Sequence, residues 1–178
     1  MAAKWSEVEG FGGWGLGRPD PSPLAPRSGG SRAGRPLSFT GEFRHAIDAK
    51  GRLIVPSRLR EELPDNKVVL AQYFTGCIGL WWGEGWAKLE EDLLGLKRGS
   101  AESRRLLRVF ASSVHQDEVD KQGRVTVPQS LRDYAGISRD VVVIGAIDHG
   151  ELWAPDRWEQ EKALDEGGLD ALAQHVDF

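Results

Sequence analysis

Residues 47–56 read Ile-Asp-Ala-Lys-Gly-Arg-Leu-Ile-Val-Pro, and residues 119–128 read Val-Asp-Lys-Gln-Gly-Arg-Val-Thr-Val-Pro. The similarity continues beyond both stretches at a constant offset and without a gap. Residues 43–86 align with residues 115–158 at 11 identities in 44 positions, of which two are tryptophan pairs. An internal repeat of this kind constrains the whole architecture. The chain therefore contains two homologous half-domains.

The period of the repeat, from position 47 to position 119, is too long for a solenoid or a propeller blade, and two copies are too few for either. Two related halves in one chain are expected to pack about a pseudo-twofold axis, as the subunits of a homodimer do. Phe43, His45 and Ile47 alternate with polar neighbours as in a strand, and a turn and a second strand ending at Pro56 follow. The pattern predicts a β-hairpin in each half, with the two hairpins side by side.

The fold class that we predict is α+β, mainly β, with the two halves forming one barrel flanked by helices. The expected segments are an N-terminal extension (1–38), the first repeat (41–86), connecting helices (87–112), the second repeat (114–158) and an acidic C-terminal helix or tail (159–178). The extension is rich in Gly, Pro, Ser and Arg and cannot bury enough surface to offset its ordering entropy. We expect it to be disordered.

Composition excludes several classes of protein. No run approaches the roughly 18 to 20 apolar residues of a membrane span, and no secretory signal is present. Cys77 is the only cysteine, which suits a reducing compartment, so we expect a cytoplasmic protein without a membrane partner. The net charge is -4, but the acids gather near the C-terminus while residues 44–60 and 97–108 are basic. The net charge argues mildly against binding nucleic acid, and this distribution of charge weakens the objection.

The repeated motif supplies the candidate site. An Asp that opens a turn accepts backbone N–H bonds from the residues ahead of it, and Gly takes the positive φ that other residues resist. We therefore assign a structural role to Asp48, Gly51, Asp120 and Gly123. Arg52 and Arg124 follow their aspartates by four residues and have two possible roles, an ion pair within the turn or direct contact with nucleic acid. We favour nucleic-acid contact, because a planar guanidinium suits phosphates and guanine edges.

The halves differ in charge. The candidate DNA-binding residues are Arg44, Lys50, Arg52, Arg58, Lys121 and Arg124, and four of these six lie in the first copy. Asp117 and Glu118 lie near the hairpin of the second copy. Since phosphate contacts supply much of the affinity for DNA, the first copy is expected to dominate binding.

The doubled Asp-x-x-Gly-Arg-x-x-x-Pro motif, residues 41–48 (Gly-Glu-Phe-Arg-His-Ala-Ile-Asp) and Glu151-Leu152-Trp153 resemble the MraZ family, which belongs to the AbrB, SpoVT and MazE superfamily of swapped-hairpin DNA-binding proteins. The resemblance covers about residues 39–158. It implies tandem SpoVT-AbrB half-domains in a swapped-hairpin barrel, and a ring-shaped homo-oligomer associated with the nucleoid. It also implies repression through short tandem repeats in double-stranded DNA upstream of the division and cell wall gene cluster. Family members usually begin near Ser38. Residues 1–38 are therefore a lineage-specific arm or the product of a start codon placed too far upstream, and we favour the second.

Other functions receive less support. The histidines have no metal-ligand spacing and no nucleophile motif is present, so we expect neither an enzyme nor a cofactor. Gly99-Ser100 matches the cleavage site of a decarboxylase with a related barrel, but its place between two predicted helices favours a helix stop and an N-cap. The alternative function is an antitoxin-like DNA-binding module that neutralises a toxin through the acidic tail. The tryptophans Trp81, Trp82, Trp86, Trp153 and Trp158 are candidates for base stacking, but core packing is favoured, as it is for Cys77.

Overall fold

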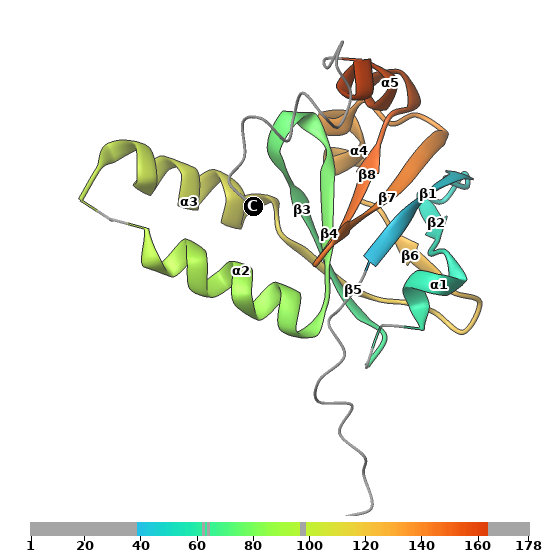
Figure 1. Cartoon of the computed structure of the whole chain (residues 1–178), viewed down its shortest axis with the longest axis horizontal. Coiled ribbons are helices and arrows are strands. Elements are labelled where there is room, and N and C mark those ends of the chain that lie inside the picture. The colour runs from blue at the N-terminus through green and yellow to red at the C-terminus, as the bar shows by residue number, and fades with distance from the viewer. Residues whose placement is uncertain (1–38, 62, 64, 97–98, 164–178) are drawn as a thin grey trace, which may run out of the picture. The chain divides into compact units, whose positions relative to one another are not determined.

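A computed structural model describes residues 39–61, 63, 65–96 and 99–163 (Figure 1). The predicted disorder of residues 1–38 and the predicted continuation of the C-terminal helix beyond Ala163 lie outside these residues.

Apart from one short 3-10 helix in the first half, the two halves contribute the same order of elements. The first half comprises β1 (Phe39–Ala46), β2 (Arg52–Ile54), α1 (Ser57–Arg60), β3 (Lys67–Gln72), the short 3-10 helix η1 (Phe74–Gly76) and β4 (Ile78–Trp81). The second half comprises β5 (His115–Glu118), β6 (Arg124–Thr126), α4 (Gln129–Ala135), β7 (Asp140–Ile147) and β8 (Gly150–Trp153). Two helices, α2 (Gly83–Gly95) and α3 (Ala101–Ser113), connect the halves, and α5 (Pro155–Ala163) follows the second.

The two halves are interleaved through their first strands. The larger sheet has the order β1-β7-β8-β4-β3-β5, in which every neighbouring pair is antiparallel. Strand β1 of the first half therefore pairs with β7 of the second, and β5 of the second half pairs with β3 of the first. The remaining strands, β2 and β6, pair with each other in a separate two-stranded sheet. The pairing is thus symmetric with respect to the sequence repeat.

The prediction of one closed barrel is met only in part. Strands β1 and β5 are the two edges of the six-stranded sheet and do not pair with each other, so the sheet remains open. Strands β2 and β6 are three residues long and form a separate sheet with each other, so they do not join these two edges. Within the described residues, one isolated antiparallel bridge, between Ile47 after β1 and Leu53 of β2, connects the two strands of the first hairpin. The architecture is a mixed α/β fold with an antiparallel six-stranded sheet.

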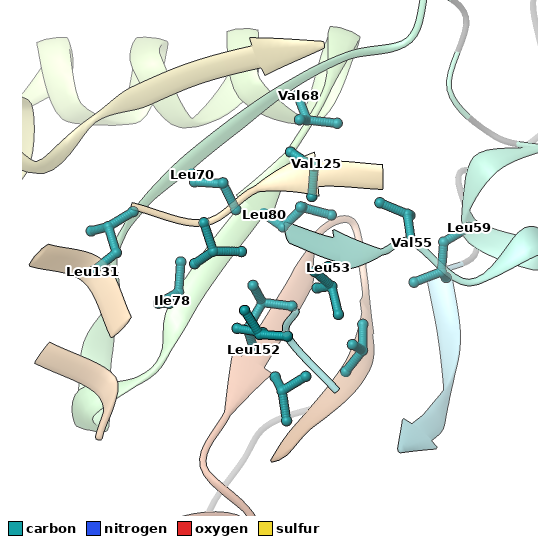
Figure 2. Packing of buried hydrophobic residues seen from close by; sticks show 14 of the residues in the cluster. Leu53, Val55, Leu59, Val68, Leu70, Ile78, Leu80, Val125, Leu131 and Leu152 are labelled. Carbon is teal, nitrogen blue, oxygen red and sulfur yellow. The ribbon is translucent and has the colours of Figure 1, made fainter. Parts of the chain in front are cut away.

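Residues at equivalent positions of the two halves fill one common core (Figure 2). Leu53 and Val125 point inward from β2 and β6, and each is 1% exposed. Around them lie three further leucines and valines of each half, namely Val55, Leu59 and Leu80 with Val127, Leu131 and Leu152. Burial of each such side chain stabilises the fold by roughly 1.5–3 kcal/mol. The small β2–β6 sheet is therefore fixed by its inner face.

Buried aromatic and sulfur groups belong to the core and not to a binding surface. Trp81, Trp82 and Trp153 are at most 3% exposed, which confirms core packing for these three tryptophans. Trp86 is partly exposed and stacks on Phe110, with ring centroids 6.4 Å apart. Cys77 is completely buried, as predicted, and burial raises the pKa of its thiol. None of the three buried indoles is accessible to a nucleotide base.

The Gly99-Ser100 step lies where α3 begins. The Ser100 hydroxyl accepts a hydrogen bond from the backbone N–H of Ser103 at 2.9 Å, which makes Ser100 the N-cap of α3. This contact confirms the predicted N-cap, because a capping serine satisfies one of the N–H groups that a helix start leaves without a partner.

Candidate nucleic-acid interface

The β2–β6 pair forms a ribbon with one buried and one outer face. Its register pairs Arg52 with Thr126, Leu53 with Val125, and Ile54 with Arg124. Because side chains alternate along a strand, burial of the central pair turns the other four residues outward. Ile54 is 50% exposed, and the side chains of Arg52 and Arg124 are 28% and 24% exposed. The outer face of the ribbon thus presents two arginines, each opposite a β-branched residue.

The turns that precede β2 and β6 lie side by side. The backbone N–H of Val55 donates to the carbonyl of Gly123 at 2.9 Å, and the N–H of Val127 donates to the carbonyl of Gly51 at 2.8 Å. Each turn is therefore fixed by the strand of the other half. Gly51 and Gly123 both have φ of +79°, a conformation that side chains resist.

Each turn is closed by its aspartate. One oxygen of Asp48 accepts the backbone N–H groups of Lys50 and Arg52, both at 2.9 Å. Asp120 accepts the N–H groups of Gln122 and Arg124 in the same way, at 2.8 and 3.0 Å. An aspartate that accepts two backbone N–H bonds from the residues ahead of it holds the turn in a single conformation.

The second carboxylate oxygen of each aspartate pairs with the arginine of the motif. Arg52 Nε lies 2.8 Å and Nη2 lies 2.7 Å from Asp48 Oδ2, and Arg124 makes the same two contacts with Asp120. Hydrogen bonding by the arginine side chain is the main cause that lowers the pKa of each aspartate to about 2. Of the two roles that the sequence offers for the arginines, ion pairing within the turn is therefore present in both halves. The pairing orients each guanidinium on the outer face.

Three further predicted residues are near the ribbon, and one is not. Lys50 and Lys121 are exposed in the two turns, and Arg58 is exposed on α1 directly after β2. Within the part of the chain that the structure describes, none of these three pairs with a carboxylate. Arg44 instead pairs with Glu159 of α5 at 2.7 Å. The structure thus places Arg44 beside the C-terminal helix.

The two edges of the ribbon are chemically unequal. On the edge of the second half, Asp117 Oδ2 accepts the backbone N–H of Thr126 at 2.7 Å, which places a carboxylate beside the outer face. The equivalent residue of the first half is His45, whose pKa is lowered by burial of the ring. A negative charge therefore flanks β6, while the corresponding residue beside β2 is held towards its neutral form.

Three arginines that lie near the ribbon are not among the six DNA-binding residues predicted from the sequence. Arg60 packs against Gly123, and Arg132 packs against Gly51, so each crosses from one half to the turn of the other. Arg139 lies with Arg132 along a hollow beside residues 46–49. The alignment contains a signal for two of these residues, since Arg60 and Arg132 are an identical pair in the repeat. Their location could not be inferred without the exchange of strands between the halves.

The repeat matches a known family twice. The family model described as "MraZ protein, putative antitoxin-like" matches residues 38–109 and again residues 110–173. The second match starts at 110 and the first at 38, which is the same spacing as that of the two motif copies at 119 and 47. The chain belongs to the MraZ family. Its two halves are the two copies of the MraZ unit.

The similarity to curated relatives extends over most of the length of each relative. A transcriptional regulator MraZ from Ligilactobacillus salivarius is 41% identical over 141 residues, which is 79% of this chain and 98% of the relative. The transcriptional regulator MraZ of Natranaerobius thermophilus is 38% identical over the same shares of the two chains. That of Heliobacterium modesticaldum is 45% identical over 127 residues, 70% of this chain and 88% of the relative. These names agree with the prediction of a regulator that is not an enzyme.

Among the described residues, no helix has the length and apolar character needed to cross a membrane. The same residues contain no group of three or more His, Cys, Asp or Glu side chains placed to hold a metal ion.

Proposed function

We propose that this MraZ protein binds short tandem DNA repeats upstream of the division and cell wall gene cluster and represses transcription from there. The observation that carries the proposal is the outer face of the β2–β6 ribbon, with Arg52 and Arg124 on neighbouring strands. The major groove of B-DNA admits a two-stranded β-ribbon, and arginine donates two hydrogen bonds to guanine. A ribbon with two oriented arginines has the dimensions and donors for such a contact.

The ion pairs support contact with bases. Asp48 and Asp120 engage Nε and Nη2 of their arginines, and the remaining Nη1 atoms have no partner among the described residues. An arginine whose torsions are already fixed loses less side-chain entropy when it binds. Ile54 and Thr126 add methyl groups to the same face, and such groups can pack against the methyl group of thymine.

The exchanged strands support the swapped-hairpin assignment. β1 and β5 each pair with a strand of the other half, and β2 and β6 meet on the pseudo-twofold axis. In our proposal, these hairpins are the swapped elements of two SpoVT-AbrB half-domains.

We also propose that copies of the chain form a ring through α2 and α3. Each helix has 13 residues, yet neither contains a buried residue, although helices in proteins gain most of their stability from packing an apolar face. Leu94 on α2 is 64% exposed, and Leu106 and Val109 on α3 are 40% and 50% exposed. A second copy would cover this surface.

The charges of the two helices favour a head-to-tail contact. α2 carries mainly acids, namely Glu84, Glu90, Glu91 and Asp92 with Lys88, whereas α3 carries Arg104, Arg105 and Arg108 with Glu102. α2 of one copy therefore complements α3 of the next, and a contact of this heterologous type closes into a ring when its rotation permits. A ring presents several ribbons to evenly spaced repeats, which raises affinity through effective concentration.

Footprinting on DNA upstream of the protein's own gene tests the function. At low salt we expect protection of regularly spaced short repeats, with weaker protection at higher salt because phosphate contacts release counterions. Arg52→Ala is expected to reduce protection at every repeat. An unprotected upstream region at both salt concentrations would contradict the proposal.

Val109→Asp tests the ring separately from DNA contact. The variant places a charge on the α3 surface, so we expect a smaller assembly by light scattering and an affinity for multi-repeat DNA reduced by about a hundredfold, the lower range of avidity effects. Ile54→Asp is a matched control, because both residues are 50% exposed but Ile54 lies on the ribbon. It should leave the assembly intact. An unchanged mass for the Val109 variant would refute the proposed interface.

The alternative function is an antitoxin-like module that neutralises a toxin through the acidic C-terminal segment. The family description includes the term antitoxin-like. Most of the acidic segment lies outside the described residues, so no structural observation favours this alternative over DNA binding alone.

A further inference from the structure

A hollow of about 580 Å³ lies beside the first turn. Its lining comprises residues 46–49 from the end of β1 and the turn, and Arg132, Ser138 and Arg139 from the second half. The site is thus assembled from both halves, and neither copy of the repeat contains it alone.

The two arginines of the hollow have no acidic partner among the residues that the structure describes. Arg132 donates from Nε to the carbonyl of Val127 at 3.1 Å, which holds its guanidinium beside Gly51. Arg139 is exposed, and within the described ranges neither Arg132 nor Arg139 pairs with a carboxylate. The carboxylate of Asp48 on the same lining is already engaged by Arg52 and by two backbone N–H groups. The hollow therefore carries a local excess of positive charge.

This excess distinguishes the hollow from the arginines of the ribbon. Arg52 and Arg124 are each neutralised by an aspartate at 2.7 Å, so each ion pair brings little net charge to DNA. Coulomb attraction to a phosphate depends on net charge, whereas hydrogen bonding to a base edge depends on orientation. Arg132 and Arg139 are therefore better suited to a phosphate than the ion-paired arginines are.

The equivalent positions of the other half carry additional acids. The repeat places Arg60 where the hollow has Arg132, and Lys67 where it has Arg139. Lys67 lies opposite Glu118 in the register of β3 and β5. Both residues line a different hollow of about 410 Å³, whose lining also includes Asp65 and Asp117. Lys67 is therefore surrounded by acids, whereas the lining around Arg139 includes Asp48 as its one acid.

We propose that the hollow formed by residues 46–49, Arg132, Ser138 and Arg139 binds a backbone phosphate of the DNA whose groove the ribbon enters. The inference rests on the proposed DNA-binding function and adds a second contact of a different kind. Arg132 and Arg139 supply charge, and the Ser138 hydroxyl is a further donor. The hollow positions the ribbon on the duplex, and the ribbon reads the bases.

Arg139→Gln in the full-length protein tests the proposal. Arg139 is exposed, so the variant should fold with an unchanged melting temperature. Affinity is measured over a series of KCl concentrations, on duplexes with the repeats and on scrambled duplexes. A lost phosphate contact is expected to weaken binding about three- to tenfold on both duplexes and to reduce the slope of log K against log salt by about one per bound repeat.

Lys67→Gln is the matched control, since it removes one positive charge from the position that the repeat makes equivalent to Arg139, where acids surround it. It should change affinity by less than about twofold, and Arg139→Lys should restore most of the salt slope. An unchanged slope for Arg139→Gln, or a loss confined to the repeat sequence, would overturn the phosphate site while leaving the ribbon in place. If the wild-type protein binds neither duplex, the proposed function itself fails.

Discussion

The turn at residues 48–51 and the turn at residues 120–123 have the same geometry and different surroundings. Both have an aspartate that accepts two N–H groups, a glycine at φ of +79° and an arginine paired at 2.7 Å. An arginine of the other half borders each turn, Arg132 the first and Arg60 the second. The first turn also borders Arg139, whereas Asp117 lies beside the strand that follows the second. Conformation is therefore set by the repeated motif, and electrostatic character is set by residues outside the motif that the fold brings to it.

The largest difference between the two turns is expected when their arginines are removed one at a time. Arg52→Ala should weaken DNA binding about tenfold and Arg124→Ala about threefold, because the contact that Arg52 makes lies beside the basic hollow. Each variant also leaves its aspartate unpaired, so the difference between them reports the surroundings of the two turns. Electrophoretic mobility shifts at fixed salt measure both affinities. Equal losses would mean that the surroundings do not matter.

A smaller effect of opposite sign is expected at Asp117. Asp117→Asn retains an oxygen that can accept the N–H of Thr126 but removes the negative charge beside the outer face. Since like charges repel across a few ångströms even in water, we expect DNA affinity to rise about threefold at low salt, and the gain to shrink as salt screens the charge.

Asp156→Asn is the control for that change, because Asp156 is an exposed acid on α5, outside the ribbon. Mobility shifts of both variants at low and high salt give the comparison. A gain of equal size in the control would assign the effect to net charge and not to the ribbon edge.

The smallest difference is expected in the titration of the two aspartates. Each has a folded pKa of about 2, below the ordinary value of 3.8. The turn contacts are therefore fully stabilising above about pH 4, and this stabilisation is lost as the pH falls through about 2. Carboxyl carbon shifts measured by NMR should give both aspartates the same midpoint.

Arg52→Ala should raise the pKa of Asp48 towards 3.8 and leave Asp120 unaffected, because the arginine side chain is the main cause of each shift. Midpoints that already differ in the wild-type protein would show that the two turns are not equivalent in conformation.

The sequence predicted the elements of the fold well, because each leaves a local signal. The constant offset between the copies identified the halves, and alternation together with Pro56 and Pro128 located the ribbon strands. The predicted barrel is confirmed only in part, because no local sequence pattern specifies whether β1 and β5 pair with each other. Arg44 illustrates the same limit. Its contact with DNA stays a prediction, but no sequence pattern indicated its ion pair with Glu159, which is 115 residues away in the chain.

The sequence by itself determined the duplication, the aspartate that closes each turn and the arginine that pairs with it, because these contacts join residues that are close neighbours along the chain. The tertiary structure alone decided which charges surround each turn. The first strands exchange between the halves, so Arg132 and Arg139 of the second copy lie beside the turn of the first. Charges act through space and not along the chain, and for that reason a comparison of the copies residue by residue missed the basic hollow.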